Sequence, residues 1–225
     1  MQIAHIVPLN CSDLADRYND MHLLLYHWAR DSDKYLNYFK QSRKYKILDN
    51  SFYELRDQID TDDFIKCSQE IKANEIVCPD EMHNFKKTKK LVEDFIPKVP
   101  KKMKIQAVCC GKDLNDLYDC YLWMCSNEMI DVISLSKQGY KEKNLDYYSS
   151  RKVLLSEFHH RAKEIHLLGV NNVKDFFINN VRSIDGKYLA KNVYEGKIDL
   201  NTKIDRKDME KAFIFFKKFY QDYKR

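Results

Sequence analysis

The stretch that decides the fold is EIHLLGVNNVKDFFINNVRSIDGKYLAKN, which runs from Glu164 to Asn192. A short apolar segment over Ile165–Val170 leads into Asn171-Asn172, a pair that predicts the start of a helix. A second apolar segment, Val181–Ile184, follows this helix and ends at Asp185. Strand, helix and strand in this order are typical of a βαβ unit with parallel strands. The unit places the carboxylate of Asp185 at the carboxyl end of a strand, where α/β barrels carry their active sites.

Outward from this stretch, the same criteria predict strands at Ile3–Leu9, His22–His27, Tyr45–Asp49, Glu75–Cys78, Lys104–Cys109, Asp131–Leu135, Ile165–Val170 and Val181–Ile184. Several are continuously apolar, as expected for parallel strands covered by helices. Amphipathic helices are predicted around Phe85–Phe95, Leu114–Cys125, Leu154–Ala162 and Met209–Tyr220, and a further helix is predicted after the cap Asp60-Thr61-Asp62. Eight strands alternating with helices predict a compact (β/α)8 TIM barrel as a single domain over residues 1–225. A doubly wound open sheet is the alternative, but no Gly-rich phosphate loop follows any strand.

The composition is that of a folded globular protein, with 44% hydrophobic and 32% charged residues. Five glycines and four prolines leave no room for a flexible linker. No apolar run is long enough to cross a membrane, and the opening MQIAHIVPLN lacks the features of a signal peptide. We therefore expect a cytoplasmic protein without a membrane partner. The net charge of +5 permits nucleic acid as a partner without requiring it.

The seven cysteines are scattered, and none forms a CxxC pair or has histidines at zinc-finger spacing. Most lie within predicted strands or helices, where cysteine acts as a small buried hydrophobe. We expect reduced structural thiols, no metal and no cofactor.

Carboxylates stand at the carboxyl ends of three separate predicted strands: Asp49, Asp80 and Asp185. Gln106 lies within the fifth strand, where its side chain can face the barrel interior. Any one of these aspartates, taken alone, is better explained as a helix cap or turn residue. Three at equivalent positions favour a site, because like charges around one barrel mouth raise at least one pKa into the range useful for acid–base chemistry.

These residues occur in a recognisable order: Asp49-Asn50, Pro79-Asp80-Glu81, Gln106, His166-Leu167-Leu168-Gly169-Val170 and Ser183-Ile184-Asp185. The order resembles that of the tRNA-guanine transglycosylase superfamily, and most closely that of the short phage-type members that place 7-deazaguanine bases in DNA. The resemblance covers nearly the whole predicted barrel, from Ile3 to Asn192. Each motif is short, so the resemblance depends on the order and spacing of the motifs.

The resemblance implies a role for each matching residue. Asp185 matches the nucleophile that attacks C1′ of the target nucleoside, and Asp49 matches an aspartate that transfers protons. Asp80, assisted by Gln106, matches the group that hydrogen-bonds the guanine-like edge. The remaining substrate-binding positions are Asn50, Tyr53 as a stacking aromatic, Ser134, Leu135, Leu168 and Gly169. Two departures reshape the base pocket: the family's Asp-Ser-Gly-Gly reads Asp49-Asn50-Ser51-Phe52, and its Gly-Gly pair is Ser134-Leu135.

The residue types suit this chemistry independently of the resemblance. Displacing a base from C1′ passes through an oxocarbenium-like state, which a carboxylate can trap covalently as in retaining glycosidases. A second carboxylic acid must give the departing purine a proton and later accept one from the incoming base. A third, ionised carboxylate can accept two N–H donors from guanine. The target base must be flipped out of a duplex or be single-stranded already.

The expected partners are guanine-containing DNA and a free 7-deazaguanine base, preQ0 or a derivative. DNA is favoured over tRNA because the clustered Cys and His ligands of the tRNA enzymes' zinc subdomain are missing and the chain stops soon after the eighth predicted strand. Lys187 and Lys191 are expected to contact phosphate beside the reacting sugar, whereas the lysines from Lys86 to Lys104 can equally form a solvated face. A tRNA transglycosylase, a base-releasing nucleosidase and a non-catalytic nucleic-acid-binding barrel are the alternatives. The oligomeric state stays open.

Overall fold

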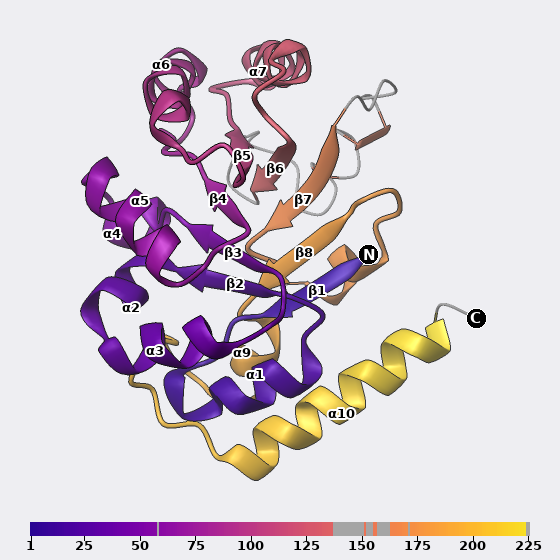
Figure 1. Cartoon of the computed structure of the whole chain (residues 1–225). Coiled ribbons are helices and arrows are strands. Elements are labelled where there is room, and N and C mark those ends of the chain that lie inside the picture. Colours follow the sequence, from indigo (N-terminus) through magenta and orange to yellow (C-terminus); the bar gives the residue numbers. More distant parts are fainter. Residues whose placement is uncertain (58, 137–150, 152–154, 157–162, 171, 224–225) are drawn as a thin grey trace.

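A computed structural model of the chain describes residues 1–57, 59–136, 151, 155–156, 163–170 and 172–223. Its strands form one parallel sheet in the order β1-β8-β7-β6-β5-β4-β3-β2, which curves into a nearly closed barrel (Figure 1). The strands are β1 (Gln2–His5), β2 (His22–Leu25), β3 (Lys46–Asp49), β4 (Glu75–Val77), β5 (Lys104–Cys109), β6 (Val132–Ser136), β7 (Glu164–Leu168) and β8 (Ser183–Gly186). The predicted (β/α)8 barrel is confirmed.

The gap between β1 and β2 is bridged mainly by side-chain hydrogen bonds instead of a strand ladder. The amide of His5 donates to Asn19 Oδ1 at 3.0 Å, and Asn19 Nδ2 donates back to the His5 carbonyl at 3.0 Å. The amide of Ile3 donates to Asp20 Oδ2, and the Asp20 amide donates to the Ile3 carbonyl, both at 3.0 Å. Asn19 and Asp20 directly precede β2, so they satisfy the edge of β1 that would otherwise stay unpaired.

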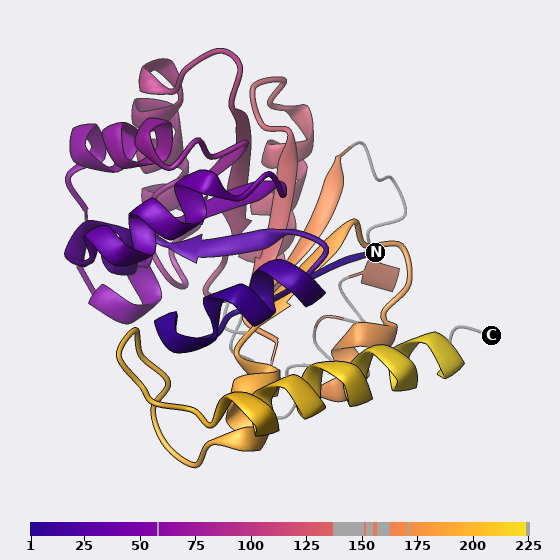
Figure 2. The ribbon, with the colours of Figure 1, turned by 60° about the horizontal axis from the view of Figure 1, so that its bottom comes forward.

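Helices surround the strands (Figures 1 and 2). The α-helices are α1 (Ser12–Tyr18), α2 (Tyr26–Asp31), α3 (Asp33–Gln41), α4 (Phe52–Leu55), α5 (Thr61–Glu70), α6 (Phe85–Phe95), α7 (Leu114–Ser126), α9 (Tyr188–Val193) and α10 (Arg206–Tyr223). Short 3-10 helices are η1 (Leu9–Cys11), η2 (Ile96–Lys98) and η3 (Val173–Phe177). No helix in these described ranges combines the length and apolar character needed to cross a membrane.

Local capping explains where several helices begin. Asp60 accepts from the amides of Asp62 and Asp63 and so starts α5, as the sequence predicts. Asn172 accepts from the Lys174 amide, but the segment after it forms only the 3-10 helix η3. The helix predicted around Leu154–Ala162 falls mostly outside the described residues.

Strand ends differ from the predicted ones by at most two residues, except in β1. That strand ends at His5 instead of Leu9, and Pro8, which has no N–H, could not have continued the ladder to Leu9. In β8 the ladder continues past the predicted end, since the amide of Val170 donates to the Asp185 carbonyl at 2.8 Å. Asp185 therefore lies within β8, paired in register with Ala4 of β1. The strand fixes its backbone more firmly than a loop would.

The core is built from the apolar strand residues and from the helix faces that cover them. Ile47, Leu48 and Ile76 are fully buried on neighbouring strands. The cysteines are free thiols; six are buried and Cys125 is partly exposed. The C-terminal helix α10 lies alongside α1 (Figure 2). Its Phe213 and Phe216 pack edge-on against the buried ring of His5.

Candidate active site

A cavity of about 860 Å³ lies at the carboxyl ends of the strands. Its wall includes Asp49 at the end of β3, Asp80 after β4 and Asp185 in β8. The structure therefore brings the three predicted carboxylates to one cavity, although 136 positions separate the first from the last in the sequence numbering. The other predicted residues that line it are Asn50, Tyr53, Leu168, Gly169, Lys187 and Lys191.

Asp185 is held by the barrel wall through one of its two carboxylate oxygens. Its Oδ1 accepts from the Gly169 amide at 3.1 Å and contacts His166 Nε2 at 3.1 Å. No described residue hydrogen-bonds Oδ2, and the side chain is among those that line the cavity. A buried carboxylate fixed at one oxygen and unbonded at the other can act as a nucleophile toward a bound ligand.

Asp49 has an environment that disfavours the ionised form of its carboxyl group. Burial raises its pKa well above the usual value, and the negative charges of Glu54, Asp185 and Asp80 raise the pKa further. A hydrogen bond from the Ser51 amide to Asp49 Oδ2, at 2.8 Å, opposes this shift without reversing it. The raised pKa favours the protonated form of Asp49, which is the form that can donate a proton inside the cavity.

The turn after Asp49 depends on an unusual backbone conformation. Ser51 has φ 58° and ψ 19°, in the left-handed region that favours glycine. This is one of the positions at which the transglycosylase pattern has glycine and this chain does not. Asn50 supports the turn by accepting from the Phe52 amide at 2.8 Å.

Asp80 is buried and is tied to Asn50. Asn50 Nδ2 donates both to Asp80 Oδ1 at 2.9 Å and to the Cys78 carbonyl at 2.6 Å. Burial raises the pKa of Asp80 to about 6, while the hydrogen bond from Asn50 works against that rise and the charge of Glu81 adds to it. Asp80 is therefore an ionised acceptor above about pH 6 and a neutral group below it.

Gln106 and Ser134 lie one layer deeper than the cavity wall. Alternate residues of a strand face the same side, and Val108 and Ser136 line the cavity two positions further along the same strands. Both Gln106 amide atoms and Ser134 Oγ are buried without a hydrogen-bond partner among the described residues. Leaving such groups unpaired costs about 1–3 kcal/mol each, which marks the layer as one that a ligand or water completes. Leu135, on the opposite strand face, is buried and does not line the cavity.

Arg151 is a site residue that the sequence reasoning missed. Its buried guanidinium donates to the carbonyls of Leu135 and Leu168, at the ends of β6 and β7, and pairs with Asp175 at 3.4 Å. It also interacts electrostatically with Asp185. No local pattern marks this arginine, because all its partners are distant in the sequence.

The cavity rim is formed by charged and aromatic side chains. Tyr53 is 44% exposed, and the Arg56 guanidinium lies 4.5 Å from the centre of its ring. Lys187 Nζ lies 3.3 Å from Glu54 Oε1 and 5.2 Å from the ring centre of Trp28. Polar residues that line the cavity and that the sequence did not single out include His27, Asp31, Glu54, Arg56, Lys197 and Asn201.

The lysines between Lys86 and Lys104 do not line the cavity. Several pair with carboxylates on the outer surface, as Lys87 does with Glu81 and Lys104 with Glu164. Their placement favours the solvated-face interpretation over phosphate binding at the mouth.

Comparison with models of known protein families yields no match, and comparison with curated proteins likewise yields none. Within the described residues, no three His, Cys, Asp or Glu side chains are grouped as metal ligands would be. Functional assignment therefore starts from the geometry of the cavity.

Proposed function

We propose that this protein is a DNA-guanine transglycosylase, an enzyme that exchanges guanine in DNA for a 7-deazaguanine base such as preQ0 or a derivative. The main support for the proposal is the convergence of Asp49, Asp80 and Asp185 on one cavity, in which burial raises the pKa of both Asp49 and Asp80. The resemblance in motif order assigns those three positions to the same chemistry.

In the first half-reaction, Asp185 Oδ2 attacks C1′ of the target nucleotide and the bond from C1′ to the base breaks. Asp49 gives its proton to the departing guanine, which leaves as the neutral base. The result is a covalent glycosyl ester on Asp185 and an ionised Asp49. In the second half-reaction, Asp49 takes a proton from the incoming 7-deazaguanine, whose nitrogen attacks C1′ and releases the Asp185 carboxylate.

Base recognition is assigned to Asp80 and Gln106. An ionised Asp80 accepts two N–H donors of a guanine-like edge, with Asn50 holding one of its oxygens in place. Among the described residues, both the donor and the acceptor of Gln106 lack partners, which suits a base edge that presents both. Gln106 is fully buried below the cavity wall, so the proposed contact requires the base edge to reach below Val108.

The cavity size agrees with a nucleotide as ligand. Small-molecule sites occupy about 300–1,000 Å³, and this cavity lies toward the upper end of that range. Lys187, Lys191, Lys197 and Arg56 stand at the rim, where the phosphates flanking a flipped nucleotide would lie. The choice of DNA over tRNA rests on the likeness to the short phage-type members.

The test is base exchange measured by mass. The protein is incubated with isotope-labelled preQ0 and either guanine-containing oligodeoxynucleotides or tRNA, and the nucleosides are then digested and weighed. Label in DNA, absent with Asp185→Asn, supports the proposal. Label in tRNA alone would show that the protein is a tRNA transglycosylase instead. Release of guanine without incorporation of label would show that it is a nucleosidase. No release and no incorporation on either polymer overturns the assignment.

A further inference from the structure

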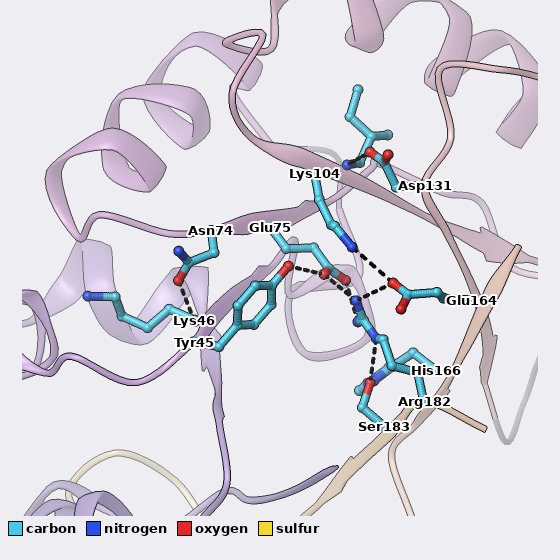
Figure 3. A network of polar contacts seen from close by, with 11 residues as sticks. Tyr45, Lys46, Asn74, Glu75, Lys104, Asp131, Glu164, His166, Arg182 and Ser183 are labelled. Atoms are coloured by element: carbon cyan, nitrogen blue, oxygen red, sulfur yellow. Dashed lines mark hydrogen bonds and ion pairs between the residues drawn. The ribbon is translucent and has the colours of Figure 1, made fainter. Parts of the chain in front are cut away.

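A chain of hydrogen bonds runs through the barrel interior to Asp185 from the opposite end. Arg182 Nε lies 3.1 Å from Ser183 Oγ, and Ser183 Oγ lies 2.7 Å from His166 Nδ1 (Figure 3). The other ring nitrogen, His166 Nε2, lies 3.1 Å from Asp185 Oδ1. His166 and Ser183 have no exposed surface, so water does not compete for these bonds.

The far end of the chain is fixed by an ion pair. The Arg182 guanidinium donates to both oxygens of the fully buried Glu75, each at 2.8 Å, and Tyr45 donates to the same carboxylate at 2.7 Å (Figure 3). A planar guanidinium held in this fork has one orientation. Its Nε–H therefore points at Ser183 in a fixed direction.

The donor capacities set the direction of every bond. Arginine can only donate, so Ser183 Oγ accepts from Arg182. Among the described residues, His166 Nδ1 is the only other partner of this hydroxyl, so its single buried hydrogen is satisfied only by donation to Nδ1. Nδ1 must then be the acceptor, which leaves the imidazole neutral with its hydrogen on Nε2. This hydrogen assignment follows from the network. The Nε2–H donates to Asp185 Oδ1, the same oxygen that accepts from the Gly169 amide.

We propose that His166 is a positioning residue whose tautomer, set by Ser183 and Arg182, holds Asp185 with Oδ2 directed at the substrate; the proposal rests on the nucleophilic role proposed for Asp185. Two donors on Oδ1 fix the plane of the carboxylate. With the opposite tautomer, the lone pair of Nε2 would face the carboxylate and repel it. The histidine itself does not touch the reacting atoms.

Three variants separate this role from a contribution to folding. His166→Leu removes both ring nitrogens, whereas His166→Gln keeps an N–H near the position of Nε2. Ser183→Ala removes one hydroxyl and leaves His166 and Asp185 in place, so it tests the tautomer alone. Ser68→Ala is the matched control, because Ser68 is a fully buried serine in α5 that bonds only its own helix through the Ile65 carbonyl.

The first measurement needs no substrate. Nitrogen-15 NMR of the full-length protein at pH 7 should show His166 protonated at Nε2 and bare at Nδ1. Ser183→Ala should convert this signal to a mixture of tautomers, and Ser68→Ala should leave it unchanged. If the parent protein shows the Nδ1–H form, or if Ser183→Ala leaves the signal unchanged, the proposal that Ser183 and Arg182 set the tautomer of His166 is overturned.

The second measurement is the rate of covalent adduct formation with a guanine-containing oligodeoxynucleotide in a single turnover. A misplacement of about 1 Å can slow a reaction about 100-fold, so we expect a loss of that order in His166→Leu, with oligonucleotide affinity unchanged. His166→Gln should recover most of the rate, and Ser183→Ala should fall between these two. A parent adduct combined with a parent-like rate in both His166→Leu and Ser183→Ala overturns the positioning role alone. No adduct in the parent protein overturns the proposed function and, with it, the role of His166 in that reaction.

Discussion

At the amino end of the barrel, Glu75 and Arg182 form a bidentate ion pair, which Tyr45 completes with a third hydrogen bond. At the carboxyl end, Asp49, Asp80 and Asp185 face one cavity, and two of them have a raised pKa. Both ends bury charge. One end matches each charge with an opposite partner, and the other concentrates like charges. The difference indicates that paired charges at the amino end stabilise the barrel, while like charges gathered at the carboxyl end cost stability, as expected if that end is the proposed active site.

The largest expected effect of a substitution at either end of the barrel is the loss of catalytic rate when Asp49 is replaced. Asp49→Asn keeps the size of the side chain but removes the proton it would donate, so the rate of base departure should fall about 10²–10⁴-fold. The parent rate should also decline as pH rises through the raised pKa of Asp49, because only the protonated form acts as the acid. That alkaline decline should disappear in the variant. A pH profile of single-turnover guanine release checks both expectations, and an unchanged profile in Asp49→Asn would assign the acid to another group.

At the amino end, a substitution in the ion pair should lower the stability of the fold. Glu75→Gln removes the buried counter-charge of Arg182 and leaves only the exposed carboxylate of Glu164 beside it, so the free energy of unfolding should fall by about 3 kcal/mol. Glu164→Gln is the matched control, since Glu164 also contacts Arg182, at 3.3 Å, but its side chain is 46% exposed. Removing that exposed partner should cost no more than about 1 kcal/mol. Urea unfolding monitored by circular dichroism measures both, and equal losses would contradict the distinction between the two contacts.

Replacing Asp80 should raise the free energy of unfolding, whereas replacing Glu75 should lower it. A pKa raised to about 6 in the folded protein means that the native state holds its proton after the unfolded chain has lost it, so ionisation of Asp80 costs stability above about pH 6. Asp80→Asn removes this cost and should raise the free energy of unfolding by about 1–3 kcal/mol at pH 7–8. The gain should vanish below about pH 4, where the carboxyl is neutral in both states.

The same variant should lose base affinity, because an amide N–H replaces one acceptor oxygen. Titration of guanine or preQ0 by calorimetry, beside unfolding curves across pH, checks the pair of effects. In the parent protein, affinity should weaken as pH falls through 6. A variant that is neither stabilised at pH 7–8 nor weaker in base binding would show that Asp80 is an ordinary buried turn residue.

The smallest effect concerns the rim. Lys187→Gln should weaken DNA binding modestly and lower the slope of log affinity against log salt by about 1, the amount expected for one phosphate contact. Lys104→Gln, on the outer surface and paired with Glu164, is the control and should leave the slope unchanged. Fluorescence anisotropy with a labelled oligonucleotide at several salt concentrations provides the slopes. Equal slopes for all three proteins would remove Lys187 from the interface.

Much of the fold and part of the site could be predicted from sequence. Apolar runs located the eight strands, because a parallel strand covered by helices has to be apolar along its length. Asp49, Asp80 and Asp185 were selected as polar residues ending such runs, and the closure of the barrel brings strand ends to one mouth. Asp60 was identified as a helix cap from its own neighbours in sequence. Each of these inferences uses information contained within a few residues.

What only the tertiary structure decided involves partners that are far apart in the chain. No local sequence pattern predicts three of these contacts. They are the hydrogen bonds of Asn19 between β1 and β2, those of Arg151 to the ends of β6 and β7, and the ion pair of Glu75 with Arg182. The pKa values of Asp49 and Asp80 depend on burial and on surrounding charges, which exist only once the barrel has closed. Sequence periodicity reports which face of a strand is buried, whereas hydrogen bonding and electrostatics depend on distances between atoms. For that reason the sequence determined the barrel and the position of its carboxylates, and the folded structure determined which partners hold Asp185 and which surroundings raise the pKa values of Asp49 and Asp80.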